Sequence, residues 1–463
     1  MSALRTSLRW LMWTAIVILA APVVLYVLAL AVNWRDQPPN AEALELAAAA
    51  ARDPIPDAMN AYVFALGFAA PRVADPAFVG GTRAEWIRAL AANPDVNPAS
   101  DPYPGSAPDF QQIPEPLAAV LTPCAAPDAA CVMAFENAGS DLRAQLELQR
   151  SLIDRYRTLL GYRAWQEVTT GDLRGPLAPY AEVGYARRLF LLDTWLLAVT
   201  GDATEVRARL GADLALWRMV LAAADSLNGK GIASSFVGQH FTWGNLILRR
   251  LPPERRADGV PEGWRKSLTD AERSIHAAFV GELRYVNNTT LLLKRGPAAS
   301  SAGANQPSML DRVSTRLQLN LLQPQATANR YAAMLAKLEM LLKVPYAELG
   351  AALARAPETD DAPSGVLAAT YNVAGNAIAT PQPALLASYA ARVADLEGAR
   401  RAAVLTVDLR VLKIPAEFAG AMVPLAASRD PYTGGPFTWT AAPAMVTFTG
   451  LEPTNGTRHR FLY

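Results

Sequence analysis

The most constraining feature of this sequence is an uncharged apolar run from Trp10 to Val32. As a helix rising 1.5 Å per residue, the run would be about 34 Å long, and the hydrocarbon core of a bilayer is about 30 Å thick. The sequence therefore predicts one transmembrane helix, with the aromatic residues Trp10, Trp13 and Trp34 as membrane anchors. Pro22 lies inside the run, where a membrane helix tolerates it if neighbouring groups satisfy the carbonyl that it leaves free.

The charges beside the run predict its orientation. Arg5 and Arg9 precede it, whereas Arg35 follows it next to Asp36. Because basic residues favour the cytoplasmic side, residues 1–35 are expected to form a cytoplasmic stub and an inner-membrane anchor. The rest of the chain would then lie in the periplasm.

Two other interpretations of the run remain open. Ala29-Leu30-Ala31 resembles the cleavage site of a secretory signal peptide, although the apolar part of such peptides spans only about 7–15 residues. The run could also be a buried helix of a soluble protein.

The composition excludes some partners and suggests a source. The 43 basic and 42 acidic residues nearly cancel, so no basic surface for nucleic acid is expected. Alanine is abundant and arginine greatly outnumbers lysine, which is typical of a GC-rich bacterial genome.

The two cysteines, Cys124 and Cys131, predict a disulfide if the chain turns between them. On one continuous helix they would be about 10.5 Å apart, whereas a disulfide needs Cα atoms within about 7 Å. Pro127-Asp128 provides a break, so Cys124 is expected to end one short helix and Cys131 to lie in the next. An oxidising periplasm fits this pairing; two free thiols or a metal site are the alternatives.

Beyond the anchor, periodic apolar residues predict a mainly α-helical fold. Gly201-Asp202 separates two long helices and predicts a tight αα-hairpin, because Gly suits the end of a helix and Asp the start of the next. Val404–Val411 is β-branched enough to be a strand instead. The expected helices are 41–52, 57–69, one starting at 82, 140–162, 180–200, 202–221, 229–251, 269–293, 309–322, 326–342, 346–355, 365–377 and 384–412.

The chain is expected to divide into the anchor, a helical domain over 36–425 and a short C-terminal appendage over 426–463. The polar stretch 295–307 marks a possible boundary within the helical domain, and 93–114 reads as a long surface loop. Alternating residues near the C-terminus predict short antiparallel strands. A helical solenoid is an alternative, although no repeat of about 34 residues is visible.

Three features carry a resemblance to known proteins: DLALWRMVLAAADSLNGK (213–230), IPDAMNAYVFALGF (55–68) and the paired cysteines. With them, the chain resembles uncharacterised proteobacterial proteins that have one N-terminal transmembrane helix and an alanine-rich helical periplasmic body. The ending DPYTGGPFTW (430–439) resembles a short C-terminal motif of exported bacterial proteins, and more distantly a turn of type II secretion pseudopilins, whose cleavage motif this chain lacks. The resemblance implies a cellular location and an architecture but no activity.

Motifs for catalysis are scarce. The three histidines form no zinc-binding pair, and no nucleophile elbow, phosphate-binding loop or dinucleotide-binding motif is found, so neither metal nor cofactor is expected. The candidates for a catalytic site are His240, Ser235 and Gln239, which share one apolar helix. A structural histidine in the core is the simpler interpretation of His240.

Charged residues elsewhere are given structural interpretations. Glu282 and Arg284 would point apart on a helix, so they are expected to be solvated or paired elsewhere. Glu397, Arg400 and Arg401 are expected on the exposed face of a long helix.

These observations favour a membrane-anchored protein that acts by binding, as an envelope scaffold, accessory subunit or assembly factor with a protein partner. An anchored hydrolase that uses carboxylates in a helical cleft is the alternative, because carboxylate catalysis leaves little trace in a sequence. A lipid- or substrate-binding helical module is a third possibility.

Overall fold

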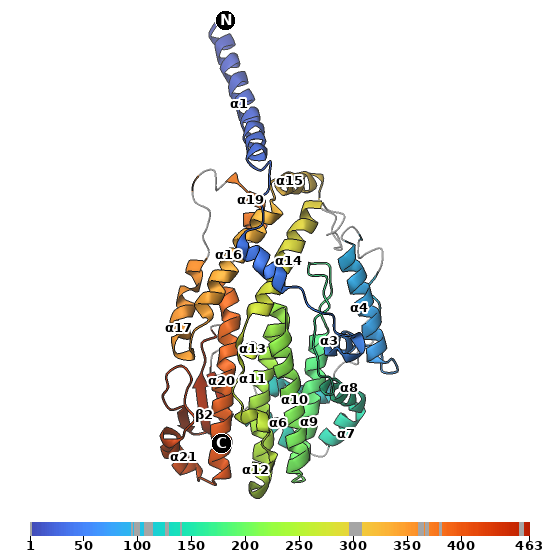
Figure 1. The fold of residues 1–463 in the computed structure, drawn as a ribbon, viewed down its shortest axis with the longest axis vertical. Coiled ribbons are helices and arrows are strands. Elements are labelled where there is room, and N and C mark those ends of the chain that lie inside the picture. The colour runs from blue at the N-terminus through green and yellow to red at the C-terminus, as the bar shows by residue number, and fades with distance from the viewer. Residues whose placement is uncertain are drawn as a thin grey trace.

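The chain forms an elongated helical body from one end of which helix α1 projects (Figure 1). The computed structural model describes residues 2–93, 96, 102–105, 114–125, 129–138, 141–295, 308–359, 365, 370–378, 382–452 and 458–463. Residues 296–307 of the predicted linker and most of the 93–114 loop therefore lie outside the described residues.

The α-helices of the described chain are α1 (Ser2–Val32), α2 (Ala41–Ala49), α3 (Ala61–Leu66), α4 (Pro76–Ala92), α5 (Glu115–Leu121), α6 (Ala129–Ala138), α7 (Asp141–Leu148), α8 (Arg150–Leu160), α9 (Tyr180–Ala198), α10 (Ala203–Ala223), α11 (Leu227–Arg250), α12 (Arg256–Gly259), α13 (Asp270–Arg273), α14 (His276–Arg295), α15 (Met309–Leu319), α16 (Pro324–Leu342), α17 (Tyr346–Arg355), α19 (Val373–Ile378), α20 (Pro383–Val411) and α21 (Ala416–Met422). The strands are β1 (Thr438–Ala441), β2 (Ala444–Thr449) and β3 (Arg458–Leu462). The mainly α fold is confirmed.

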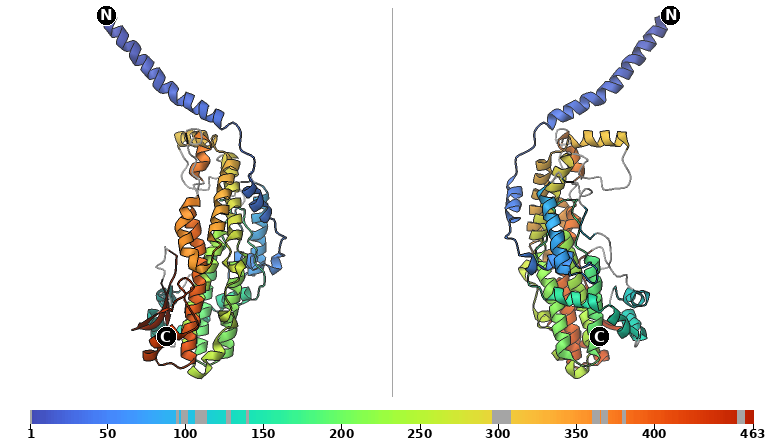
Figure 2. Two further views of the ribbon diagram at one scale, coloured as in Figure 1. Left: turned by 60° about the vertical axis from the view of Figure 1, so that its left-hand side comes forward. Right: turned by 90° about the vertical axis from the view of Figure 1, so that its right-hand side faces the viewer.

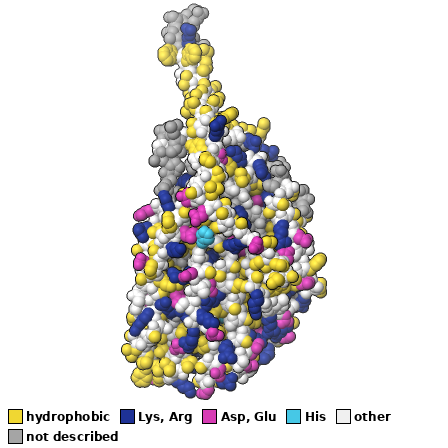
Figure 3. All heavy atoms as spheres, in the orientation of Figure 1, with side chains coloured by type: hydrophobic (Ala, Val, Ile, Leu, Met, Phe, Trp, Pro, Cys, Tyr) yellow, Lys and Arg dark blue, Asp and Glu magenta, His cyan; other side chains and the backbone are white. Residues whose placement is uncertain are grey.

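Helix α1 is long and apolar enough to cross a membrane. It continues through Pro22 without interruption, and the most apolar 18-residue stretch within Arg9–Val32 has a mean hydropathy of 2.8. Trp10, Trp13 and Trp34 are exposed, and the most apolar part of the helix is not covered by the body. The space-filling view shows a largely apolar shaft above a body on which acidic and basic side chains are interspersed (Figure 3).

The αα-hairpin of α9 and α10 is confirmed. Gly201 has a φ of +80°, which a glycine adopts without strain, and Asp202 accepts a hydrogen bond from the Glu205 N–H (3.0 Å). Val206, Leu210 and Trp217 on α10 are buried, as their spacing predicts.

The body has two hydrophobic cores that share helix α20. The smaller core lies towards α1 and joins α2, α14 and α16 to the start of α20, where Leu386 and Ala387 are buried. The larger core joins α3, α8, α9, α10, α11 and the C-terminal strands to the rest of α20. Helix α20 remains helical through Val404–Val411, because it runs between packed elements for most of its length (Figure 2).

The C-terminal appendage is a three-stranded antiparallel sheet in the order β1-β2-β3. Trp439 pairs with Val446, and Val446 pairs with Phe461. The alternating pattern buries Val446, Phe448 and Phe461 against the larger core, so the predicted β appendage is confirmed.

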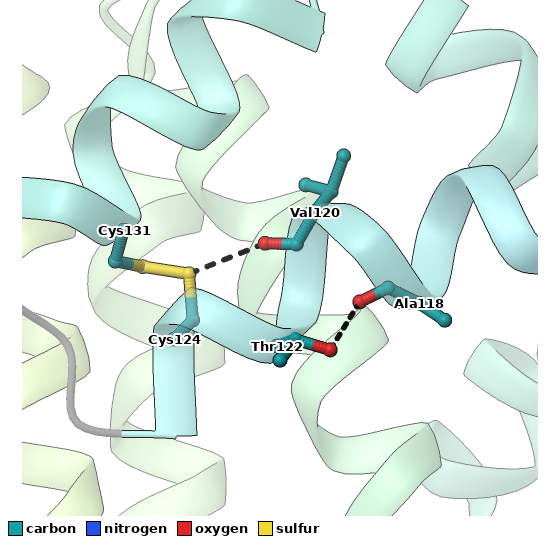
Figure 4. Close-up of a disulfide and its surroundings, with 5 residues drawn as sticks. All are labelled: Ala118, Val120, Thr122, Cys124 and Cys131. Atoms are coloured by element: carbon teal, nitrogen blue, oxygen red, sulfur yellow. Dashed lines mark hydrogen bonds between the residues drawn. A yellow bond between two sulfur atoms is a disulfide. The ribbon is translucent and has the colours of Figure 1, made fainter.

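The cysteines form a disulfide with a Cα–Cα distance of 4.7 Å. Cys124 lies in a 3₁₀ turn (Thr122–Ala125) that follows α5, and Cys131 lies in α6, so the bond joins two helical segments as predicted (Figure 4). The predicted break at Pro127-Asp128 lies outside the described residues. Phe135 on α6 packs against Trp195 and Trp243, so the disulfide holds a segment that covers the core.

Replacing Cys124 and Cys131 together with serine is expected to lower the free energy of unfolding by about 2 kcal/mol, because the bond closes a loop of only seven residues. Urea unfolding followed by tryptophan fluorescence measures this loss. Reducing agent should cause a similar loss in the unaltered protein and none in the variant. Equal stability of the two proteins under oxidising conditions would contradict the prediction.

Four local predictions are wrong. The expected helix 57–69 is a 3₁₀ turn (Asp57–Met59) followed by the shorter α3, because Asn60 is extended and caps α3. The expected helix 140–162 is interrupted at Gln149, which is buried and has a non-helical ψ of 12°. Helix α4 begins at Pro76, because Asp75 caps it, and Thr82 bonds back to the Phe78 carbonyl within the helix. The Thr269 capping box forms but opens only the short α13, and the chain leaves helical geometry at Ser274 before α14 begins.

The charged side chains of α20 are also not on an exposed face. Glu397 is 1 % exposed and Arg400 is 7 % exposed. Arg400 donates to both Glu397 oxygens (2.6 and 2.9 Å), and Arg401 donates to one of them (2.8 Å). Burial raises the pKa of Glu397, but these two arginines outweigh it and hold the pKa below its usual value. The expected exposed face is absent because neighbouring segments surround this part of α20.

Candidate functional site

A carboxylate in the larger core is the centre of a buried polar network. Asp213 on α10 accepts hydrogen bonds from the Tyr156 hydroxyl (2.5 Å) and from Arg187 on α9 (2.9 and 3.0 Å). The side chains of Asp213 and Arg187 are 0 % exposed. Burial raises the pKa of Asp213, but Arg187 and His240 outweigh it and hold the pKa well below its usual range.

His240 on α11 completes this network in one tautomer. Its Nε2 accepts a hydrogen bond from Trp264 Nε1 (2.9 Å), and its Nδ1 lies 2.7 Å from Asp213. Because an indole N–H can only donate, Nδ1 must carry the ring proton and donate it to Asp213. Burial lowers the pKa of His240, so the ring is neutral at pH 7. With both nitrogens bonded and no exposure to solvent, the ring fits a structural role.

The other two catalytic candidates do not form a site with His240. Ser235 is exposed and accepts a hydrogen bond from Gln239 (3.2 Å). Gln239 in turn accepts one from Arg187 (3.3 Å). The structure thus places Ser235 and Gln239 at the edge of the Asp213 network, while His240 points into its interior.

A second group of polar side chains includes two adjoining carboxyl groups. Glu167 follows a segment that Asn60 holds in place, since the Asn60 amide exchanges two hydrogen bonds with the Gln166 backbone (2.8 and 3.0 Å). Asp225 immediately precedes Ser226, whose side chain caps the N-terminus of α11. The carboxyl pair therefore lies at the positive end of a long helix.

Helices approach this carboxyl pair closely. A Cβ on Gly229 would lie 1.9 Å from Glu167 Oε1, and one on Gly281 of α14 would lie 1.6 Å from the Asp225 carbonyl oxygen. Both positions require glycine for this reason, and the carboxyl pair is confined between α11, α14 and the segment that follows α8.

Burial and the adjoining Asp225 raise the pKa of Glu167 to about 8. Burial also raises the pKa of Asp225, against the opposing effect of Arg284 and Arg52. One oxygen of each carboxyl group accepts no hydrogen bond within the described chain. Since ionising both of two adjoining carboxyl groups is energetically unfavourable, one of them is expected to hold a proton at neutral pH.

Two arginines border the carboxyl pair. Arg52 lies 3.8 Å from Asp225, and Arg284 on α14 donates to the Thr169 hydroxyl (3.2 Å). Arg284 is half-buried beside the pair, which fits the expectation that it pairs elsewhere than with Glu282. A neutral carboxyl beside an ionised one can supply a general acid and a base at neutral pH.

The junction between α1 and the body forms a third site. Asp36 accepts hydrogen bonds from the backbone N–H groups of Gln325 and Ala326 (both 2.9 Å) and so caps the first turn of α16. The Asn33 side chain donates to the Thr370 carbonyl (3.0 Å) and accepts from the Asn372 N–H (2.7 Å). The segment after α1 is therefore fixed to the body by hydrogen bonds rather than free.

A pocket of about 450 Å³ opens beside this junction. Asn329 forms part of its wall and bonds to the chain after α1, donating to the Pro38 carbonyl (2.8 Å) and accepting from the Asn40 N–H (3.0 Å). Arg330 and Lys337 supply cationic groups, and none of the described lining residues is acidic. The pocket therefore suits a polar or anionic group. Its lining residues are Gln37, Asn40, Ala326, Asn329, Arg330, Ala333, Met334, Lys337, Thr359, Tyr371, Asn372 and Asn376.

Comparison with protein-family models, with curated proteins and with solved structures gives no match. Among the described residues, no group of three or more His, Cys, Asp or Glu side chains is placed to hold a metal ion.

Neither the carboxyl pair nor the pocket is marked by a motif in the sequence. Glu167 lies in an irregular stretch without periodicity, and only the helix cap at Ser226 marks the position of Asp225. In the sequence, the Asp213 network is indicated only by Asp213 itself, an acidic residue among the apolar positions of α10. The asparagines of the pocket come from segments far apart in the chain, so no local pattern connects them.

Proposed function

We propose that this chain is a single-pass protein of the bacterial inner membrane whose helical body lies in the periplasm and acts by binding, as an envelope scaffold, accessory subunit or assembly factor. The hydrogen-bonded junction between α1 and the body carries this proposal. Asn33 and Asp36 join the apolar helix to α16 and to residues 370–372, which gives the body a fixed position relative to a membrane.

Two further observations support the same address. The arginines before the apolar run favour a cytoplasmic N-terminus, and the Cys124–Cys131 disulfide suits an oxidising compartment. The pocket at the junction offers amide, cationic and aromatic groups to a polar segment of a partner.

Affinity purification of the tagged full-length chain from detergent-solubilised membranes, after cross-linking in cells, tests the binding role. We expect one stoichiometric protein partner. The variant Ala333→Trp should fill the pocket and reduce its recovery, while Ala347→Trp, at an exposed position on α17, should not. Recovery of no stoichiometric protein, or equal recovery with both variants, would contradict a partner that binds at this pocket.

An anchored hydrolase is the second candidate, and the Glu167–Asp225 pair favours it. The raised pKa of Glu167 would let it act as a general acid while Asp225 remains charged beside Arg52 and Arg284. Turnover of glycoside, ester and phosphate substrates by the purified chain tests this function. Activity that Glu167→Gln abolishes would favour the hydrolase, and no turnover of any substrate would count against it.

A further inference from the structure

Helix α15 carries an apolar stripe that the described body leaves uncovered. Met309, Val313 and Leu317 are 82 %, 49 % and 42 % exposed. At 3.6 residues per turn, these three positions fall within about 80° of the helix circumference. Leu319, by contrast, is buried against the body.

The polar residues of α15 are arranged around this stripe. Arg316 and Arg312 follow one edge of it on the helix circumference, while Asp311 and Gln318 lie on the opposite face. An apolar stripe bordered by basic residues is typical of helices that lie in the plane of a membrane surface.

Helix α15 is attached directly to α1. The Tyr26 hydroxyl donates a hydrogen bond to the Leu317 carbonyl (3.1 Å) and accepts one from the Asn320 side chain (3.2 Å). Tyr26 belongs to the apolar span Arg9–Val32 and lies about 9 Å along the helix from its end at Val32.

This attachment places α15 at the depth where an interfacial helix belongs. Interfacial helices bury their apolar face about 5–10 Å into the boundary between headgroups and acyl chains. Helix α15 lies across the end of the body from which α1 emerges (Figure 1) and runs sideways rather than along the length of the body (Figure 2).

We infer that α15 is a second, in-plane membrane contact, with its apolar stripe in the lipid and Arg312 and Arg316 near anionic phosphate groups of the headgroups. The inference rests on the proposed function, because it requires α1 to cross the membrane. The contact is assigned to lipid because Tyr26 fixes α15 to a part of α1 that would itself lie in the bilayer. Together with the junction at Asp36, α15 would set the orientation of the body.

The test uses the full-length chain in nanodiscs of phosphatidylethanolamine and phosphatidylglycerol. Since the native cysteines are paired, a cysteine introduced at Val313 can be labelled alone with an environment-sensitive fluorophore. Gln318→Cys is the matched control on the opposite face of α15, and Val24→Cys reports on α1. Quenching is measured with spin-labelled phospholipid and, separately, with iodide in the water.

We expect the label at position 313 to shift its emission to the blue and to lose intensity with spin-labelled lipid, and the label at 318 to be quenched by iodide. If the label at position 313 is exposed to iodide while the label at position 24 is quenched by lipid, the inference is overturned and the anchor is left intact. Shielding of 313 from both quenchers would also overturn it, in favour of a protein interface or a second copy of the chain. Exposure of 24 to iodide would overturn the anchor as well.

Discussion

Replacing Asp213 with alanine is expected to lower the free energy of unfolding by about 3–5 kcal/mol, because it leaves the Arg187 guanidinium buried without its counter-ion. The variant also removes the acceptor for the Tyr156 hydroxyl and for the His240 Nδ1–H. A buried donor without an acceptor adds to the loss. Urea unfolding of the purified chain in detergent measures the effect.

An exposed ion pair provides the matched control. Asp154 on α8 pairs with Arg157 near the surface, so Asp154→Ala is expected to cost less than about 1 kcal/mol. The loss of stability for Asp213→Asn should fall between those of the two alanine variants, since the asparagine side chain keeps the shape of aspartate but not its charge. A cost for Asp213→Ala as small as that for Asp154→Ala would show that the network does not hold the core together.

The second large effect concerns the pH dependence of stability at Glu167. Its pKa is raised from the ordinary value of 4.5 to about 8 in the folded chain. Between these two values the unfolded chain has lost the proton while the folded chain still holds it, so rising pH favours unfolding. The stability contributed by the neutral carboxyl group is therefore fully present below about pH 4.5 and is lost as the pH rises to about 8.

Each unit of this shift in pKa corresponds to about 1.4 kcal/mol. Because neighbouring charges partly compensate the ionised carboxyl pair, we expect the free energy of unfolding to fall by a total on the order of 2–4 kcal/mol. Urea unfolding at pH 5, 6, 7 and 8 measures it. The loss should be much smaller in Glu167→Gln, which cannot ionise, and subtracting the two curves removes the titration of groups common to both proteins. Parallel curves would mean that Glu167 is already ionised at pH 5.

Features set by neighbouring residues could be predicted from the sequence. The hairpin at Gly201-Asp202 follows from a C-terminal glycine and an N-cap within two residues, and the disulfide follows from two cysteines on either side of a predicted break. The C-terminal strands follow from alternation alone. In each case the decisive interactions are made within a few residues along the chain.

Features that depend on packing could not be predicted from the sequence. In the sequence, Glu397 and Arg400 look like surface residues, because the burial of a charged pair on a helix can be recognised only when the surrounding helices are known. The break at the buried Gln149 has no local break signal in the sequence. Glu167 and Asp225 come together only because Asn60 holds one segment and Ser226 caps the other.

We propose that α1 crosses the membrane and leaves the body outside the cytoplasm. Reporter fusions made through a flexible linker after Tyr463 test this topology directly, using a fluorescent protein that matures only in the cytoplasm and a phosphatase that is active only in the periplasm. We expect dark cells with the first fusion and phosphatase activity with the second. Bright cells together with an inactive phosphatase would contradict this topology.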